Sequence, residues 1–108
     1  METKIVQPVK GGDNIIIIGK RWFDKANGNT YFSSKALVNG NEVCSIDFQY
    51  GYGDHYITET FELLEKLGYL PGVKHHNNGS SEPFWSYCER NNIVYNHYVI
   101  DVSRKKDL

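Results

Sequence analysis

The sequence predicts an α+β domain in which helices cover one face of an antiparallel sheet, with its elements in the order βββααβ. The sheet is expected to contain a three-strand meander and a C-terminal strand, and one main and one shorter helix cover it. Three observations favour this fold: a β-branched run followed by two Asn-Gly turns, an amphipathic helical pattern, and a final strand-like pattern at residues 92–102. The 108 residues suffice for one domain, expected at 14–108 after a flexible segment at 1–13.

The first hairpin is expected to turn at Asn27-Gly28, because Asn-Gly accepts the positive φ angles of a type I′ turn. A two-residue loop at this point would place Phe23 opposite Phe32, which would pair two aromatic side chains on one face. Gly19 lies inside the first strand pattern, NIIIIGKRWFDK, and indicates a bulge or a close approach to the backbone.

The second hairpin is expected at Asn39-Gly40, and the strand after it alternates so that one side carries Cys44, Ile46, Phe48 and Tyr50. A three-residue loop, 39–41, would pair Phe32 with Phe48 and Ala36 with Cys44. A two-residue loop would instead place polar Ser33 opposite Ile46. Because a slip of one residue turns every side chain to the other face, the sequence favours the three-residue loop and an inward Tyr50.

The main helix is expected to begin after Asp54, as N-cap, and to end before Gly68, as the C′ residue. Its predicted core-facing row consists of Ile57, Phe61, Leu64 and Leu67, widened by Thr60 and Leu63.

A shorter helix is expected after a polar loop, with Ser80 or Ser81 as its cap and Pro83 in its first turn. Phe84, Trp85, Tyr87 and Cys88 are expected on its inner side. The final strand pattern follows, and its predicted inward residues are Tyr98, Ile100 and Val102.

The bulk properties exclude several classes of function. A net charge of −1 is unlike that of a dedicated duplex-DNA binder, which carries a marked basic excess. No run approaches the about 20 apolar residues that span a bilayer, and the first residues lack the layout of a signal peptide. The two cysteines, Cys44 and Cys88, have no metal or redox spacing, so we expect reduced, packed thiols.

No residue pattern indicates an active site, a metal site or a cofactor. Gly51-Tyr52-Gly53 precedes a helix but lacks the phosphate-loop patterns, and Asp54 would occupy the position of an anion. His75 and His76 are adjacent, which is not a metal-ligand spacing. Cysteine–histidine sets can be assembled on paper from Cys88, His97 and Asp101 or from Cys44 and His55, but packed thiols account for both cysteines better. We therefore expect that the protein is not an enzyme.

One candidate surface interleaves basic and aromatic residues on the first two strands, as single-stranded nucleic-acid binders do. It consists of Lys20, Arg21, Trp22, Lys25, Tyr31 and Lys35. The alternative interpretation is an ordinary exposed sheet face with amphipathic side chains.

A second candidate set suits a protein partner, because Tyr and Trp are enriched in interface hot spots and an acidic helix face can dock on a basic surface. The candidate contacts are Trp22, Tyr31, Tyr50, Tyr52, Glu59, Glu62 and Glu65. Tyr52, at the corner between strand and helix, is the tyrosine expected to be most accessible.

Four segments, KRWFDKANGNTYFS, VNGNEV, FQYGYGDHYITETFELLEKLGYLPG and IDVSRKKDL, together resemble a family of small uncharacterised proteins encoded by tailed bacteriophages. The resemblance covers residues 19–70 and 99–108. It implies an accessory protein acting in the cytoplasm of an infected bacterium, and it assigns no functional residue. Small phage proteins of this kind are often inhibitors of host defence, including anti-CRISPR proteins.

Together these observations favour a non-enzymatic, stoichiometric inhibitor that binds a host defence protein or protein–nucleic acid complex, such as a CRISPR effector or nuclease. The first alternative is a single-stranded nucleic-acid-binding protein that uses the basic-aromatic face. The second alternative is a small nucleotide-binding scavenger or enzyme. Neither a membrane nor a cofactor enters any of these hypotheses.

Overall fold

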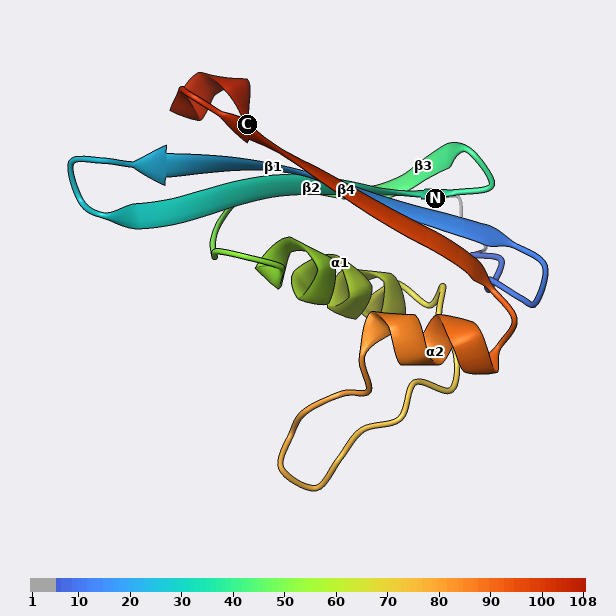
Figure 1. Ribbon diagram of the computed structural model, residues 1–108. Coiled ribbons are helices and arrows are strands. Elements are labelled where there is room, and N and C mark those ends of the chain that lie inside the picture. Colours follow the sequence, from blue (N-terminus) through green and yellow to red (C-terminus); the bar gives the residue numbers. More distant parts are fainter. Residues whose placement is uncertain (1–5) are drawn as a thin grey trace, which may run out of the picture.

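The computed structural model describes residues 6–108 and has an α+β fold with the predicted element order. The strands are β1 (Asn14–Asp24), β2 (Asn29–Val38), β3 (Asn41–Tyr50) and β4 (Val94–Val102). The helices are α1 (His55–Lys66), α2 (Phe84–Arg90) and a C-terminal 3-10 turn, η1 (Lys105–Asp107). Both α-helices lie on one side of the sheet, and η1 lies on the other (Figure 1).

The sheet is mixed, so the prediction of a purely antiparallel sheet is wrong. Its strand order is β3-β2-β1-β4; the β1–β2–β3 meander is antiparallel as expected, but β4 runs parallel to β1. The parallel direction of β4 follows from the place at which the chain returns to the sheet after α2. Gly12 N–H donates to the Asn92 carbonyl at 2.9 Å and Val94 N–H to the Asp13 carbonyl at 2.9 Å, so β4 starts beside the start of β1.

The expected flexible segment at 1–13 falls partly outside the described residues. Of its described part, Val9 is buried, and its N–H donates to the Tyr69 carbonyl at 2.8 Å. This contact ties the approach to β1 to the segment that follows α1.

The first hairpin has a four-residue loop, 25–28, so the predicted two-residue loop is wrong. Trp22 lies opposite Tyr31, and Phe23 lies opposite Thr30 instead of Phe32. The Asp24 carboxylate accepts hydrogen bonds from the Ala26 N–H and the Asn27 side chain, at 3.1 and 2.8 Å, and so stabilises the wider loop. The shift is two residues, which leaves each side chain on its predicted face.

The second hairpin is a two-residue turn, because Asn39 and Gly40 have φ of 52° and 85° and Val38 pairs with Asn41. The predicted three-residue loop is therefore wrong. The predicted pairing of Ala36 with Cys44 is nevertheless confirmed, because an irregularity between Ala36 and Leu37 takes up the extra residue.

A second irregularity, between Phe32 and Ser34, changes which face the end of β3 presents. Ser34 pairs with Ile46 but Phe32 pairs with Gln49, so β3 has one residue more than β2 in this interval. The extra residue turns Phe48 and Tyr50 to the face opposite that of Cys44 and Ile46. The prediction that all four face inward is therefore wrong for Phe48 and Tyr50, which are both exposed.

The core lies between the sheet and the two α-helices. Its fully buried side chains include Ile15, Ile17, Phe32, Tyr56, Leu64 and Tyr87. Gly19 lets the ring of Tyr56 lie on β1, because a Cβ at Gly19 would be 2.6 Å from Tyr56 Cδ2. This contact confirms the predicted close approach at Gly19 and makes Tyr56 a central core residue.

Helix α1 is rotated relative to the prediction, so that Tyr56, Thr60, Phe61 and Leu64 are buried while Leu67 is exposed. Asp54 takes the N-cap position but forms no side-chain cap hydrogen bond. The end of the helix is as predicted. Gly68 has φ of +94°, and Tyr69 N–H donates to the Leu64 carbonyl at 3.0 Å, as in a Schellman motif.

Helix α2 starts later than predicted, with Pro83 as its N-cap, so that neither Ser80 nor Ser81 caps it. Its buried residues are Phe84, Tyr87 and Cys88, and Trp85 is 55% exposed instead of inward. The side chains of β4 also face differently from the prediction. Tyr98 and Ile100 are 57% and 58% exposed, because the parallel register aligns them with Ile18 and Lys20 on the face away from the helices.

Candidate interaction surface

Four aromatic side chains lie side by side on the sheet face that the α-helices leave open, and we call them the aromatic face: Trp22, Tyr31, Phe48 and Tyr50. Tyr31 stacks between Trp22 and Phe48, with ring centroids 5.8 and 4.8 Å away. Tyr50 meets Tyr31 edge-on at 5.8 Å. The three predicted contacts on these strands are thus brought together, and Phe48 joins them.

The strand registers build this cluster. Trp22, Tyr31 and Tyr50 occupy directly opposed positions on three neighbouring strands, where cross-strand side chains touch. Phe48 reaches the cluster because of the bulge in β3. The sequence therefore predicts that Trp22 and Tyr31 share one face, although in another register, but without the bulge it places Tyr50 and Phe48 on the wrong face.

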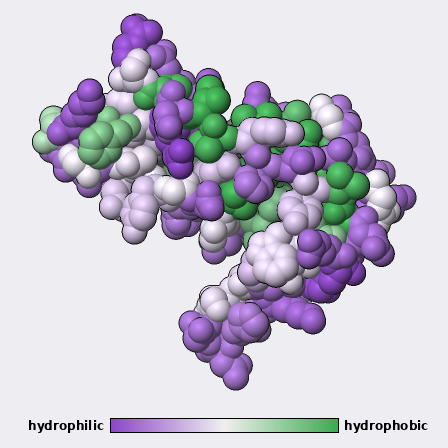
Figure 2. Space-filling view, viewed as in Figure 1, coloured by the Kyte–Doolittle hydropathy of each residue, from purple (hydrophilic) through white to green (hydrophobic). Residues whose placement is uncertain are grey.

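The open face continues onto β4 as an apolar surface. Val94, Tyr98 and Ile100 are each more than half exposed, although all three are large and apolar or aromatic. Figure 2 shows apolar side chains in green over the strands, whereas the loop beneath the helices is hydrophilic. Exposed apolar side chains that share one face are typical of a binding surface.

Three lysines surround the aromatic face. Lys20 and Lys35 are exposed and share the facing of Trp22 and Tyr31 on β1 and β2. Lys105, in η1, places its Nζ 5.0 Å from the centroid of the Phe48 ring, a cation–π contact. The margin of the aromatic face therefore carries three lysines, and the acids Glu42 and Asp47 lie close to Lys20 and Lys35.

The other two basic residues of the nucleic-acid set lie elsewhere. Arg21 faces the helices, where its Nε donates to Asp101 at 3.0 Å and its guanidinium donates to the Gly53 carbonyl at 3.2 Å. Lys25 lies in the loop between β1 and β2. The predicted set of six is thus divided between two faces and a loop.

The partner-binding set is divided as well. Tyr52 is 71% exposed at the corner before α1, in accordance with its predicted accessibility. The acids Glu59, Glu62 and Glu65 lie on α1, on the opposite side of the sheet from the aromatic face. Because no single flat partner surface can contact both sides of the sheet, the seven residues do not form one site.

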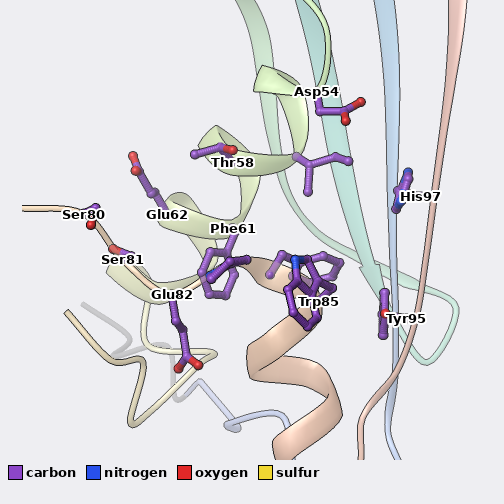
Figure 3. Close-up of a pocket in the computed structure, with 13 residues that line it drawn as sticks. Asp54, Thr58, Phe61, Glu62, Ser80, Ser81, Glu82, Trp85, Tyr95 and His97 are labelled. Atoms are coloured by element: carbon purple, nitrogen blue, oxygen red, sulfur yellow. The ribbon is translucent and has the colours of Figure 1, made fainter. Parts of the chain in front are cut away.

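A groove on the helix side of the sheet was not predicted from the sequence. It has a volume of about 450 Å³ and lies between α1, residues 80–83, the start of α2 and β4 (Figure 3). Its most exposed aromatic residue is Trp85. The spacing of Phe84, Tyr87 and Cys88 could have indicated that Trp85 is exposed. Residues i, i+3 and i+4 of so short a helix share one buried face, which excludes residue i+1.

The thiols are packed against the core. Burial raises the pKa of Cys88 to about 12 and that of Cys44 to about 11, and both are free cysteines. The histidine and the aspartate that were considered together with Cys88 have polar partners other than its thiol. His97 Nδ1 lies 3.3 Å from the Tyr56 hydroxyl, and Asp101 binds Arg21.

Within residues 6–108, no three His, Cys, Asp or Glu side chains gather in a metal-like group. In the same part of the chain, none of the helices has the length and apolarity needed to cross a bilayer.

The corner between β3 and α1 is formed by two glycines with different roles. A Cβ at Gly51 would lie 2.9 Å from the Phe32 ring, and Gly53 has φ of +60°. Both positions thus serve the change of direction between strand and helix.

Comparisons with protein-family models, with curated proteins and with solved structures find no significant match to this chain.

Proposed function

We propose that this chain is a small tailed-phage accessory protein that inhibits a host defence system by non-enzymatic, stoichiometric protein–protein binding. The proposed target is a CRISPR effector or nuclease in the cytoplasm of the infected bacterium, and the proposed contact surface is the aromatic face. The observation that carries the proposal is the four-ring cluster on the open side of the sheet. The resemblance of the sequence to tailed-phage proteins supports the biological context.

The chemistry of the aromatic face suits a protein partner. Trp and Tyr carry much of the binding energy of protein interfaces, because they bury a large area with few rotatable bonds. Tyr31 is held between two rings, so less conformational entropy remains to be lost on binding. Lys20 and Lys35 would favour an acidic margin on the partner and speed its association.

Affinity capture tests this proposal directly. The immobilised chain is expected to retain a defence protein from host lysate, and Trp22→Ala is expected to weaken retention by about thirtyfold or more, a hot-spot loss of about 2 kcal/mol or more. Phe23→Ala is a matched control, since Phe23 is an exposed neighbour on the same strand but has the opposite facing. In cells, expression of the chain should protect phage from an active defence system.

The protein-binding proposal fails if neither capture nor phage protection is observed. It also fails for this surface if Trp22→Ala and Phe23→Ala behave alike, because the two side chains differ chiefly in which face they occupy.

The second candidate function is single-stranded nucleic-acid binding. The observation that favours it is the position of Lys20, Lys35 and Lys105 on the same face as Trp22 and Tyr31. Fluorescence anisotropy with labelled oligo-dT and oligo-U measures it. Binding should fall steeply as salt rises from about 50 to 200 mM and should be lost in Trp22→Ala, whereas no binding at the lower salt concentration excludes this function.

A further inference from the structure

The groove beside Trp85 has apolar walls and polar ends. Its walls are formed by Ile57 and Phe61 of α1, by Phe84 and Trp85 of α2, and by Tyr95 of β4. In Figure 3, Phe61 and Trp85 occupy its middle, Asp54 and His97 lie toward one end, and Glu62 lies toward the other. Its volume of about 450 Å³ is in the range of clefts that hold small ligands or single side chains.

The charges that line the groove are negative. Among residues 6–108, neither Asp54 nor Glu62 forms an ion pair, and no Lys or Arg is among the residues that line the groove. The third carboxylate, Glu82, is already satisfied, because the Arg90 Nε donates to it at 3.0 Å. Asp54 and Glu62 are therefore the carboxylates available to an occupant.

The surroundings of Glu62 disfavour its charge on balance. Burial, followed by the neighbouring Glu59, raises the pKa of its carboxyl group, and the nearby His55 and His75 lower it to a smaller extent. A positive group in the groove would remove both disadvantages, since it would offset the lost hydration and oppose the charge of Glu59. Phosphate or another anion would increase them.

Trp85 offers a free aromatic surface. Phe61 packs on Phe84, and Phe84 on Tyr95, each with ring centroids 5.6 Å apart. Trp85 makes no such ring pair in the described part of the chain, although it is more than half exposed. Tryptophan is the aromatic residue that attracts a stacked cation most strongly.

We infer that this groove binds an arginine side chain from an extended segment of a partner protein. The guanidinium would donate paired hydrogen bonds to Glu62 at one end of the groove, while its aliphatic stem would pack across the apolar wall that includes Phe61 and Trp85. Arginine fits better than lysine, because its planar group matches a carboxylate with two parallel donors. The inference rests on the proposed function only in that the chain binds a protein, and it adds a second contact on the opposite side of the sheet.

Tryptophan fluorescence gives a direct test. The chain has two tryptophans, so Trp22→Phe leaves Trp85 as the reporter. This variant is titrated with three blocked tripeptides, Gly-Arg-Gly, Gly-Lys-Gly and Gly-citrulline-Gly, the last being a neutral analogue of nearly the same shape. We expect the arginine peptide to change Trp85 emission and to saturate on the order of 1 mM, the lysine peptide to bind about threefold more weakly, and the citrulline peptide at least about tenfold more weakly.

Substitutions in the groove complete the test. Glu62→Gln is expected to weaken the arginine peptide by about three- to tenfold, and Asp54→Asn by a smaller factor. Glu42→Gln is the control, because Glu42 is an exposed carboxylate on β3 that does not line the groove. Calorimetry with Trp85→Leu, an exposed position that should still fold, is expected to show loss of binding.

Two results would overturn the inference: equal binding of the arginine and citrulline peptides, or equal binding to the Glu62→Gln and Glu42→Gln variants. The capture experiment tests the proposed function separately from the groove. Loss of host-partner capture in Trp22→Ala with peptide binding intact supports both sites. Peptide binding without any capture retains the groove and rejects the proposed function.

Discussion

Trp22 and Tyr31 lie directly opposite each other on β1 and β2, with ring centroids 5.8 Å apart and ring planes 25° from parallel, on the sheet face that no α-helix covers. The pair lies near the hairpin end of β1 and β2 and outside the main core between sheet and helices. Aromatic residues outside the core are better placed to bind a partner than to stabilise the fold. Substitutions can therefore test their effects on binding and on stability separately.

Tyr31 is expected to matter more for binding than for stability. Tyr31→Ala removes ring contacts to Trp22, Phe48 and Tyr50 and should lower the free energy of unfolding by about 1 to 2 kcal/mol. Urea denaturation followed by circular dichroism measures this change. Tyr31→Phe keeps the stacked ring and should lie within about 0.5 kcal/mol of the parent. Similar losses in both variants would show that the stacking is unimportant.

Gly19→Ala is expected to be strongly destabilising, because its Cβ would lie 2.6 Å from Tyr56 Cδ2. Overpacking of this kind costs about 1 to 3 kcal/mol. The free energies of unfolding of Gly19→Ala, Tyr56→Leu and the double variant form a cycle. If the contact is the cause, Gly19→Ala should cost clearly less in the Tyr56→Leu background, and additivity would contradict this explanation.

The hydroxyls of Ser34 and Thr60 join β2 to α1 through a buried hydrogen bond of 2.7 Å. Thr60→Val should cost about 1 to 3 kcal/mol, because it leaves the Ser34 hydroxyl buried with one partner fewer. Adding Ser34→Ala should recover part of this loss, since both polar groups are then removed. Thermal unfolding of the four proteins compares these costs, and a double variant less stable than the sum of both changes would contradict the argument.

The pair formed by Glu82 and Arg90 predicts an acid-dependent stability. Hydrogen bonds from Arg90 lower the pKa of Glu82 from 4.5 to about 2 in the folded chain. A carboxyl group whose pKa is depressed by folding stabilises the protein above its unfolded pKa, and this contribution disappears as the pH falls from about 4.5 toward 2.

Glu82→Gln removes that titration. Its free energy of unfolding should be lower than that of the parent at neutral pH, and the difference should shrink between pH 4.5 and 2. Glu42→Gln, an exposed site, serves as control. A constant difference between parent and Glu82→Gln across this range would show that Glu82 titrates alike in both states.

Local patterns in the sequence predicted the elements well where neighbouring residues decide them. The position of the turn at residues 39 and 40 and the glycine after α1 are set by backbone preferences at single positions, and both lie where they were expected, although the turn is one residue shorter than predicted. The location of the main helix follows from its own periodicity. These features need no contact with distant residues.

The faces of β3 and β4 could not be predicted in the same way. One extra residue in β3 turns Phe48 and Tyr50 to the open side, and alternation alone contains no mark of such a bulge. Strand β4 has apolar residues at both parities, so its inward set depends on its partner strand. The groove could not be predicted either, because Glu62 of α1 and Trp85 of α2 line the same groove only through the packing of the two helices.

The sequence by itself determined the α+β class, the element order and the placement of Trp22 and Tyr31 on one face. Only the tertiary structure decided the parallel placement of β4, the completion of the aromatic face and the groove. The physical reason is the range of the interactions. Turn and helix preferences act within a few residues, whereas the hydrogen bonds that place β4 join Gly12 and Asp13 to Asn92 and Val94, about 80 residues apart in the chain.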